Sequence, residues 1–196
     1  MVQLNAFNND WYRAGRSRPI QALWFFLGLP MLRCPLVISS AFRRGLLRLF
    51  GAQVGRGVVI KPGVRVKFPW RLSIGDHSWI GEDAWIDNLA DVSIGGSVCI
   101  SQGAYLCCGN HDWSDPAFAL IARPIVLRDG AWVGARSVLC PGVTLGECAI
   151  VAAGSVVSAD VPAFEIHAGN PARFVRRRPL RVCDPSSTRP LAAARL

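Results

Sequence analysis

A six-residue period runs through most of the chain and limits the folds open to it. Fifteen positions of this register are all Val, Ile or Leu. They are Val54, Ile60, Val66, Ile74, Ile80, Ile86, Ile94, Ile100, Leu106, Leu127, Val133, Leu139, Leu145, Val151 and Val157. The position four residues after each is small or Val in thirteen cases, Trp70 and Asn110 being the exceptions. A unit this short matches hexapeptide β-helix arrays, in which each hexad supplies one strand and a turn.

The interruptions of the period are as informative as the period itself. The register slips by two residues after the hexads of Val66 and Ile86, and by fifteen after the hexad of Leu106. Each break follows three hexads, and three hexads make one triangular coil. The sequence therefore predicts an all-β fold: a parallel β-helix of about five coils with every insertion at one corner of the prism. The longest insertion predicts one protruding loop over about 112–126, and such loops are commonly functional.

The segments on either side of the repeats lack the period. Residues 38–50 carry an apolar stripe at helical spacing, with Arg43, Arg44 and Arg48 at other positions. The stripe consists of Ile38, Phe42, Leu46 and Leu49. This pattern predicts a helix that covers the open end of the β-helix, as terminal repeats require. The same basic amphipathic helix would also fit peripheral contact with an anionic membrane.

These patterns divide the chain into three parts. We expect an N-terminal helical cap over residues 1–50, the β-helix over 51–178, and a loose C-terminal tail over 179–196. No secretory signal is evident, and the apolar stretch from Ala22 to Leu32 is too short to cross a bilayer. We therefore expect a cytoplasmic protein.

Charge and cysteine content narrow the classes of partner. The net charge is +9, with arginines concentrated at the two ends, which suits an anionic cofactor or a membrane surface. The seven cysteines form no CxxC pair and are expected to be reduced thiols. The adjacent Cys107 and Cys108 would point to opposite faces of a strand, so we expect no metal site there.

The segment over 125–176, which ends in AGNPARFVR, closely resembles the C-terminal half of hexapeptide-repeat O-acetyltransferases. The stretches PWRLSIGDHSWIGEDAWI and ISQGAYLCCGNHDW are similar to the colanic acid biosynthesis acetyltransferase group. Galactoside, maltose and nodulation acetyltransferases are more distant relatives. The resemblance implies a left-handed β-helix and a homotrimer with its active sites between subunits. It also implies direct transfer from acetyl-CoA to a sugar hydroxyl, through a tetrahedral intermediate, in exopolysaccharide or surface-glycan biosynthesis, with neither metal nor nucleic acid.

Acetyl transfer to a hydroxyl needs a base, and histidine is suited to that role near neutral pH. The chain has three histidines. His111, beside the long loop, matches the family's catalytic histidine, so the resemblance implies that it is the general base. His77 is expected at a solvent-facing turn, and His167 is expected to be structural or near one end of the cofactor.

The resemblance also supplies the cofactor and acceptor residues. Positions that match the CoA site are Gly134, Ala135, Ala153, Ser158, Arg173 and Arg176, the two arginines being placed for the phosphates. The family's acceptor-binding asparagine aligns with Gly81, so we expect Asp87 or Asn88 to take that role. Asp112 is a candidate to orient the imidazole and Trp113 a candidate shelf for a sugar ring. Both would equally well serve only to shape the loop.

Two alternatives stay open at this point. A basic surface would suit an acidic acyl carrier protein, which makes a carrier-dependent acyltransferase of lipid or glycan precursors an alternative. A non-catalytic trimeric β-solenoid scaffold is the other. A γ-type carbonic anhydrase needs three zinc-binding histidines and is excluded, because only His111 is suitably placed.

Overall fold

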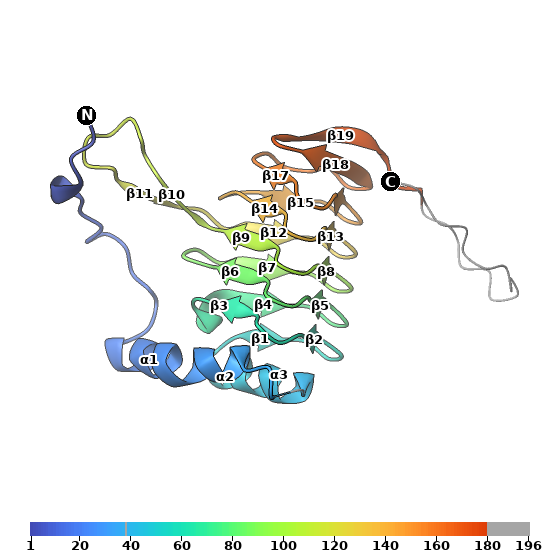
Figure 1. Cartoon of the computed structure of the whole chain (residues 1–196), viewed down its shortest axis with the longest axis horizontal. Coiled ribbons are helices and arrows are strands. Elements are labelled where there is room, and N and C mark those ends of the chain that lie inside the picture. Colours follow the sequence, from blue (N-terminus) through green and yellow to red (C-terminus); the bar gives the residue numbers. More distant parts are fainter. Residues whose placement is uncertain (38, 180–196) are drawn as a thin grey trace, which may run out of the picture.

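The computed structural model describes residues 1–37 and 39–179. Ile38 of the predicted stripe and residues 180–196 of the predicted tail lie outside the described part. The chain forms a triangular prism of stacked coils with a layer of helices beneath it, as Figure 1 shows. The prediction of a β-helix is confirmed.

Three parallel sheets form the faces of the prism, and each coil contributes one strand to each sheet. Sheet A consists of β1 (Gln53–Val54), β4 (Leu72–Ile74), β7 (Val92–Ile94), β12 (Ile125–Leu127) and β15 (Thr144–Leu145). Sheet B consists of β2 (Val59–Ile60), β5 (Trp79–Ile80), β8 (Cys99–Ile100), β13 (Trp132–Val133), β16 (Ile150–Val151), β18 (Glu165–Gly169) and β19 (Ala172–Arg177). Sheet C consists of β3 (Arg65–Val66), β6 (Trp85–Asp87), β9 (Tyr105–Cys107), β14 (Val138–Leu139) and β17 (Val156–Val157). We name the corners AB, BC and CA after the sheets that they join.

The five predicted coils are followed by part of a sixth. Val161 pairs with Leu145, and β18 pairs in parallel with β16. The last strand, β19, then returns antiparallel to β18 and closes the upper end.

The aliphatic register forms the core. Fourteen of its fifteen side chains are buried, and Val54, in the lowest coil, is half-buried. The small residues four positions later pack beside them, including buried serines whose hydroxyls are bonded. The hydroxyl of Ser78, for example, donates to the Gly95 carbonyl at 2.7 Å and accepts from the Val98 N–H at 3.0 Å. Small polar residues are therefore tolerated in the column.

All three insertions lie at the CA corner, as predicted. The first is the 3₁₀ helix η3 (Pro69–Arg71), the second spans 88–91, and the third is a β-hairpin. Its strands, β10 (Gly109–His111) and β11 (Leu120–Ala122), pair antiparallel. The predicted loop bounds of 112–126 were wrong, because Ile125 and Val126 already belong to β12. Antiparallel pairing satisfies the backbone of a segment that leaves the prism, which explains why the insertion is not an open loop.

The helical layer consists of α1 (Arg18–Leu23), a π-helical turn η2 (Trp24–Gly28), α2 (Leu29–Arg33) and α3 (Ser40–Leu49). The predicted inward face of α3 was wrong. Arg43 is buried beside Leu46 and Leu47, whereas Phe42 and Leu49 are exposed. Helical periodicity alone misplaced this face, because it assumes that arginines point to solvent.

Arg43, Arg44 and Arg48 of α3 bond carbonyls of the cap itself and of the first coil, which has no coil beneath it. Backbone groups on its lower side need partners from the helical layer. Arg43 donates to the carbonyls of Leu32, Cys34 and Ile60, Arg44 to that of Val58, and Arg48 to those of Val54 and Gly55. Trp24 donates to the Val66 carbonyl, and Ser40 bonds the N–H and carbonyl of Ile60. The cap is thus built from hydrogen-bond donors as much as from apolar contacts.

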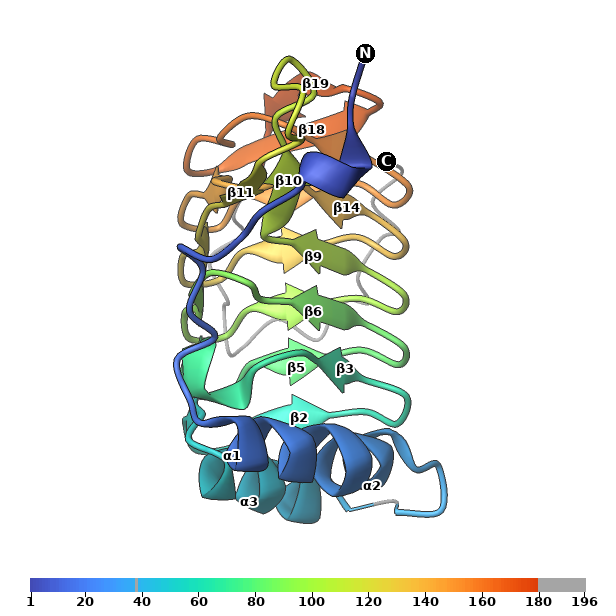
Figure 2. The ribbon, with the colours of Figure 1, turned by 90° about the vertical axis from the view of Figure 1, so that its left-hand side faces the viewer.

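Residues 1–16 form an N-terminal arm, which contains the 3₁₀ turn η1 (Leu4–Ala6) and runs from the helical layer up the CA corner to the hairpin (Figure 2). The Tyr12 hydroxyl donates to the Leu89 carbonyl, and the Gln3 N–H donates to the Pro116 carbonyl, both at 2.8 Å. The predicted helical cap at 1–50 therefore includes an extended segment that contacts the hairpin. Within the described residues, no helix is long and apolar enough to cross a membrane.

Candidate functional site

His111 ends β10 on the hairpin, where it is half-buried. Its Nδ1 atom lies 2.8 Å from the Phe118 carbonyl oxygen. Its ring stacks on the Phe118 ring, with centroids 4.3 Å apart and planes 4° apart, and the Phe7 ring lies 5.6 Å away. Because a carbonyl oxygen only accepts, the neutral imidazole donates from Nδ1 and keeps a lone pair on Nε2. This arrangement can take a proton at Nε2.

The tip of the hairpin holds the two loop candidates. The Asp112 carboxylate accepts from the Ser114 hydroxyl at 2.5 Å and from its N–H at 2.9 Å, and these bonds hold the pKa of Asp112 below its usual range. Asp112 therefore shapes the tip, and the Phe118 carbonyl orients the imidazole instead. A main-chain partner has no side-chain signature, so no sequence signal could have found it. Trp113 is 81% exposed at the tip.

Asp87 lies one coil below the hairpin, at the end of β6. Lys67 Nζ lies 3.0 Å from one carboxylate oxygen of Asp87, and the Tyr105 hydroxyl donates to the other at 3.2 Å. Tyr105 stacks on Trp85 with centroids 4.5 Å apart, and the Arg65 guanidinium lies 4.8 Å from the Trp85 ring. Sequence reasoning missed these partners, because they are outward-facing residues of three successive coils of sheet C.

Asn88 is fully buried and makes two hydrogen bonds to the backbone of Phe68 in the coil below. Its side-chain oxygen accepts from the Phe68 N–H at 2.9 Å, and its amide donates to the Phe68 carbonyl at 2.7 Å. With both side-chain atoms engaged, Asn88 joins two coils. We therefore leave it out of the acceptor site, and Asp87 is the one of the predicted pair that remains.

The residues expected to bind CoA do not gather in one place. Ala135 and Ala153 stack at the BC corner, where the Gly154 N–H donates to the Ala135 carbonyl at 2.8 Å. Ser158 lies at the CA corner, and Arg173 and Arg176 lie on β19 at the top. One chain thus places His111 and the BC-corner residues at opposite edges of sheet C.

Gly134 serves the stacking of coils. A Cβ atom there would lie 2.5 Å from the Ala153 nitrogen, and the Gly134 N–H already donates to the Val151 carbonyl at 2.8 Å. This N–H is therefore engaged within the β-helix.

The remaining histidines and the cysteine pair have other environments. His77 lies at an exposed AB turn with a φ of 60°, and His167 on β18 pairs with Glu165 at 2.9 Å. Burial raises the pKa of the Cys108 thiol to about 12, so it is not a thiolate near neutral pH. The half-buried Cys107 points away from it toward the Gly109 carbonyl. Within the described range, no group of three metal-binding side chains occurs.

Comparison with known proteins decides the family. The family described as "Bacterial transferase hexapeptide (six repeats)" matches residues 124–159. WcaF of Escherichia coli K12, named as a colanic acid biosynthesis acetyltransferase, is 38% identical over 85% of this chain and 91% of its own. This chain belongs to the hexapeptide-repeat acetyltransferases.

Other hexapeptide-repeat acetyltransferases show the same relationship at greater distance. Galactoside O-acetyltransferase of Escherichia coli K12 is 28% identical over 68% of each chain. The structure of the acetyltransferase VCA0836 of Vibrio cholerae, in complex with acetyl-CoA, superposes with a TM-score of 0.73 at 30% identity. That alignment covers 83% of this acetyltransferase and 91% of VCA0836.

Proposed function

We propose that this acetyltransferase transfers the acetyl group of acetyl-CoA to a sugar hydroxyl of a surface-glycan or exopolysaccharide precursor, with His111 as general base. The observation that carries the proposal is the bond between His111 Nδ1 and the Phe118 carbonyl, which leaves Nε2 as the basic atom. The similarity to WcaF supports the glycan acceptor, and the acetyl-CoA complex of VCA0836 supports the donor.

In the proposed reaction, His111 Nε2 takes the proton of the acceptor hydroxyl as its oxygen attacks the thioester carbonyl. A carbon–oxygen bond forms, and backbone N–H groups are the simplest donors to the oxyanion. Collapse of the tetrahedral intermediate then breaks the carbon–sulfur bond. The departing thiolate recovers the proton from the imidazolium, which gives the acetyl ester and free CoA. No side chain of the enzyme is acylated.

The donor site is proposed at the BC corner and the top of the prism. Ala135 and Ala153 stack there without side chains beyond Cβ, which leaves room for the slim pantetheine arm. Arg173 and Arg176, both exposed on β19, would bind the phosphates. Ser158 would contact the arm from the CA corner of a neighbouring copy. Asp87 and Trp113 are proposed on the acceptor side, with Asp112 supporting the hairpin tip.

The separation of the two half-sites supports the proposal of a homotrimer. His111 projects from the CA corner, whereas Ala135 and Ala153 lie at the BC corner. In a closed ring, the CA corner of one copy meets the BC corner of the next, so each active site uses two copies. Because cytoplasmic acetyl-CoA is the donor, we place the reaction in the cytoplasm at the inner face of the membrane.

The test is transfer of labelled acetyl from acetyl-CoA to sugar nucleotides, free sugars and lipid-linked glycans. We expect His111→Ala and His111→Gln to lose about 10²–10⁴-fold in rate, with the melting temperature and trimer preserved. Transfer that survives in His111→Ala would overturn the role of the base. Activity with acyl carrier protein as the only donor would favour the carrier-dependent reaction. The absence of both CoA binding and acetyl transfer would favour a scaffold.

A further inference from the structure

The segment α1–η2–α2 is apolar on its exposed side as well as its buried side. Trp24, Gly28 and Leu32 form the buried stripe. From residue 19 to residue 32 the sequence contains no Lys, Arg, Asp or Glu. A surface helix of a globular protein normally carries polar residues on its outer face, so one that is hydrophobic all round is covered by something.

The exposed apolar side chains are large and adjacent along the segment. Their exposed fractions are 50% for Leu23, 63% for Phe25, 73% for Phe26, 57% for Leu27 and 45% for Met31. Singly exposed apolar residues are ordinary, but a contiguous group of this kind marks an interaction surface. We call these five residues the apolar underside, since the segment lies at the base of the prism in Figure 1.

Charge around the apolar underside indicates an anionic partner. Exposed Arg16 and Arg18 precede it and exposed Arg33 follows it, and Asp10 is the only acidic residue among the first fifty. The arginines of α3 differ, because Arg43, Arg44 and Arg48 are bonded to backbone carbonyls of the cap. The arginines of α3 are thus engaged in the cap, although Arg48 is exposed. The segment α1–η2–α2 combines its exposed apolar side chains with the exposed Arg16, Arg18 and Arg33 at its two ends.

We infer that the apolar underside inserts into the headgroup region of an anionic lipid bilayer, with the prism standing on the membrane. Aromatic and aliphatic side chains in the acyl boundary, with arginines among the headgroups, are the usual composition of an interfacial segment. A second copy of this chain is a weaker occupant, because the acidic residues that share a cavity with Arg33, Glu82 and Asp83, belong to the second coil and not to the helical layer. In the proposed trimer, the three apolar undersides would lie in one plane and would bind the bilayer simultaneously.

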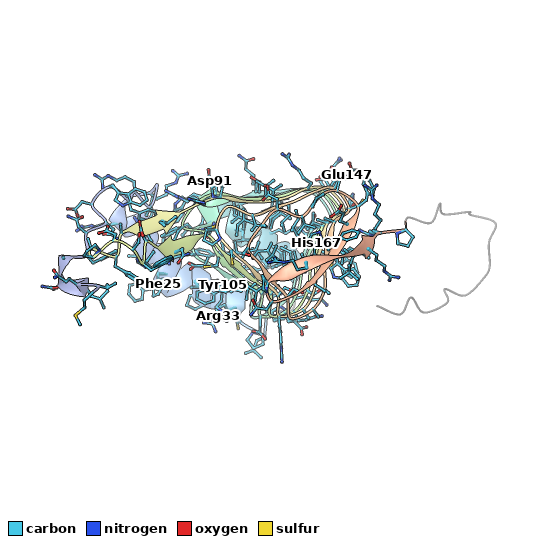
Figure 3. All side chains as sticks on the ribbon, turned by 90° about the horizontal axis from the view of Figure 1, so that it is seen from above. Phe25, Arg33, Asp91, Tyr105, Glu147 and His167 are labelled. Carbon is cyan, nitrogen blue, oxygen red and sulfur yellow. The ribbon has the colours of Figure 1, made fainter. Side chains whose placement is uncertain are left out.

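This inference rests on the proposed function and specifies its acceptor. Two adjoining cavities of about 790 and 230 Å³ share Phe25 and Leu29 as lining residues, and the second one ends at Asp87. Figure 3 shows Phe25, Arg33 and Tyr105 along one side of the molecule, with Asp91 and Glu147 along the other. The second cavity therefore lies beside sheet C, between the helical layer and the level of Asp87 below the hairpin. Coils are spaced about 4.8 Å apart, so the step from β3 to β9 is only about 10 Å. A glycan carried on a membrane lipid fits this path.

The test is co-sedimentation of the full chain with vesicles. We expect binding to phosphatidylcholine vesicles that contain phosphatidylglycerol, weaker binding to phosphatidylcholine alone, and a loss with added salt. Phe26→Ser with Leu27→Ser should weaken partitioning on the order of 100-fold, since each side chain loses its apolar transfer. The matched control is Val175→Ser on β19, at the opposite end of the prism, where the valine is 56% exposed, and it should bind like the wild type.

Two further measurements separate the outcomes. Acetylation of a soluble sugar by the Phe26→Ser, Leu27→Ser variant should equal that of the wild type, whereas acetylation of a lipid-linked glycan in vesicles should fall. If soluble sugars are acetylated but no vesicle is bound, the lipid surface is overturned and the proposed function stands. If vesicles are bound without any acetyl transfer, the proposed function is overturned and the membrane surface stands. Dissociation of the oligomer by the double variant would overturn the inference in favour of a second copy.

Discussion

His111 Nδ1 and the Phe118 carbonyl oxygen lie 2.8 Å apart across the hairpin, and the two rings are parallel within 4°. The residue whose carbonyl fixes the tautomer of His111, the proposed base, is therefore also the residue that packs against its ring. Phe118 has a φ of 53°, a conformation in which its carbonyl and its ring both reach the imidazole. The orientation of the base depends on the fold of its own hairpin.

Phe118→Ala should lower kcat by roughly tenfold, because the loss of ring stacking frees the imidazole while the main-chain carbonyl remains. The KM for acetyl-CoA should stay unchanged. Steady-state kinetics with both substrates checks this, and Phe118→Tyr should retain most of the rate. An equal change in the KM for acetyl-CoA would contradict a positioning role.

Asp87→Asn should raise the KM for the acceptor by about tenfold or more, since hydrogen bonds to a charged group contribute about 1.5–3 kcal/mol. Tyr105→Phe should have a smaller effect, because the Asp87 carboxylate retains its ion pair with Lys67 Nζ at 3.0 Å. The KM for acetyl-CoA should not move in either variant. A loss of thermal stability without any change in acceptor KM would make Asp87 structural.

Two glycine substitutions should have opposite effects on stability. Gly45 lies in α3 with nothing within 4 Å of an added Cβ, so Gly45→Ala should stabilise the fold by about 0.5–1 kcal/mol. At Gly134 the added Cβ would lie 2.5 Å from the Ala153 nitrogen, and Gly134→Ala should destabilise by about 1–3 kcal/mol or more. Urea unfolding of both variants measures these changes in the free energy of unfolding. Equal changes would argue against close stacking of the coils at Gly134.

Acid should destabilise the fold at the lower AB corner, because the Asp76 carboxylate there becomes protonated. Its carboxylate accepts from the Arg56 N–H at 2.7 Å, and this bond, chiefly, holds the pKa of Asp76 below its ordinary value of 3.8. A lowered folded-state pKa means that the contribution is complete above 3.8 and is lost as the pH falls through the lowered value. The difference in urea midpoint between wild type and Asp76→Asn should therefore be constant near neutral pH and shrink below 3.8. A difference independent of pH would show that the charge is not involved.

The sequence predicted those parts of the fold that depend on burial alone. One aliphatic residue in every hexad must face inward, so the register located the core, the coils and the CA corner. Asn88 departs from this logic, because its burial depends on two bonds to the Phe68 backbone that exist only once the coils have stacked. Likewise, Arg43 faces inward because it donates to the carbonyls of Leu32, Cys34 and Ile60, which come together only once the cap has packed beneath the first coil.

The candidate site was predicted less completely for a related reason. His111 follows from the resemblance and from its place beside the longest insertion. Its orienting partner is a main-chain atom. The groups around Asp87 come from neighbouring coils, with Lys67 twenty positions before it and Tyr105 eighteen positions after it. The CoA residues match the family one by one, yet they lie at different corners. The proposed homotrimer rests on this separation, which only the three-dimensional arrangement reveals.

The arginines beneath the first coil also determine where the β-helix ends. A β-helix has no inherent length, since each coil leaves the same unpaired backbone for the next to extend. Here Arg43, Arg44 and Arg48 donate from below to carbonyls of the first coil, and β19 folds back over the top. Without the helical layer, the first coil would be an open template for the last coil of another molecule. The cap is thus what makes this chain a discrete enzyme rather than one segment of a filament.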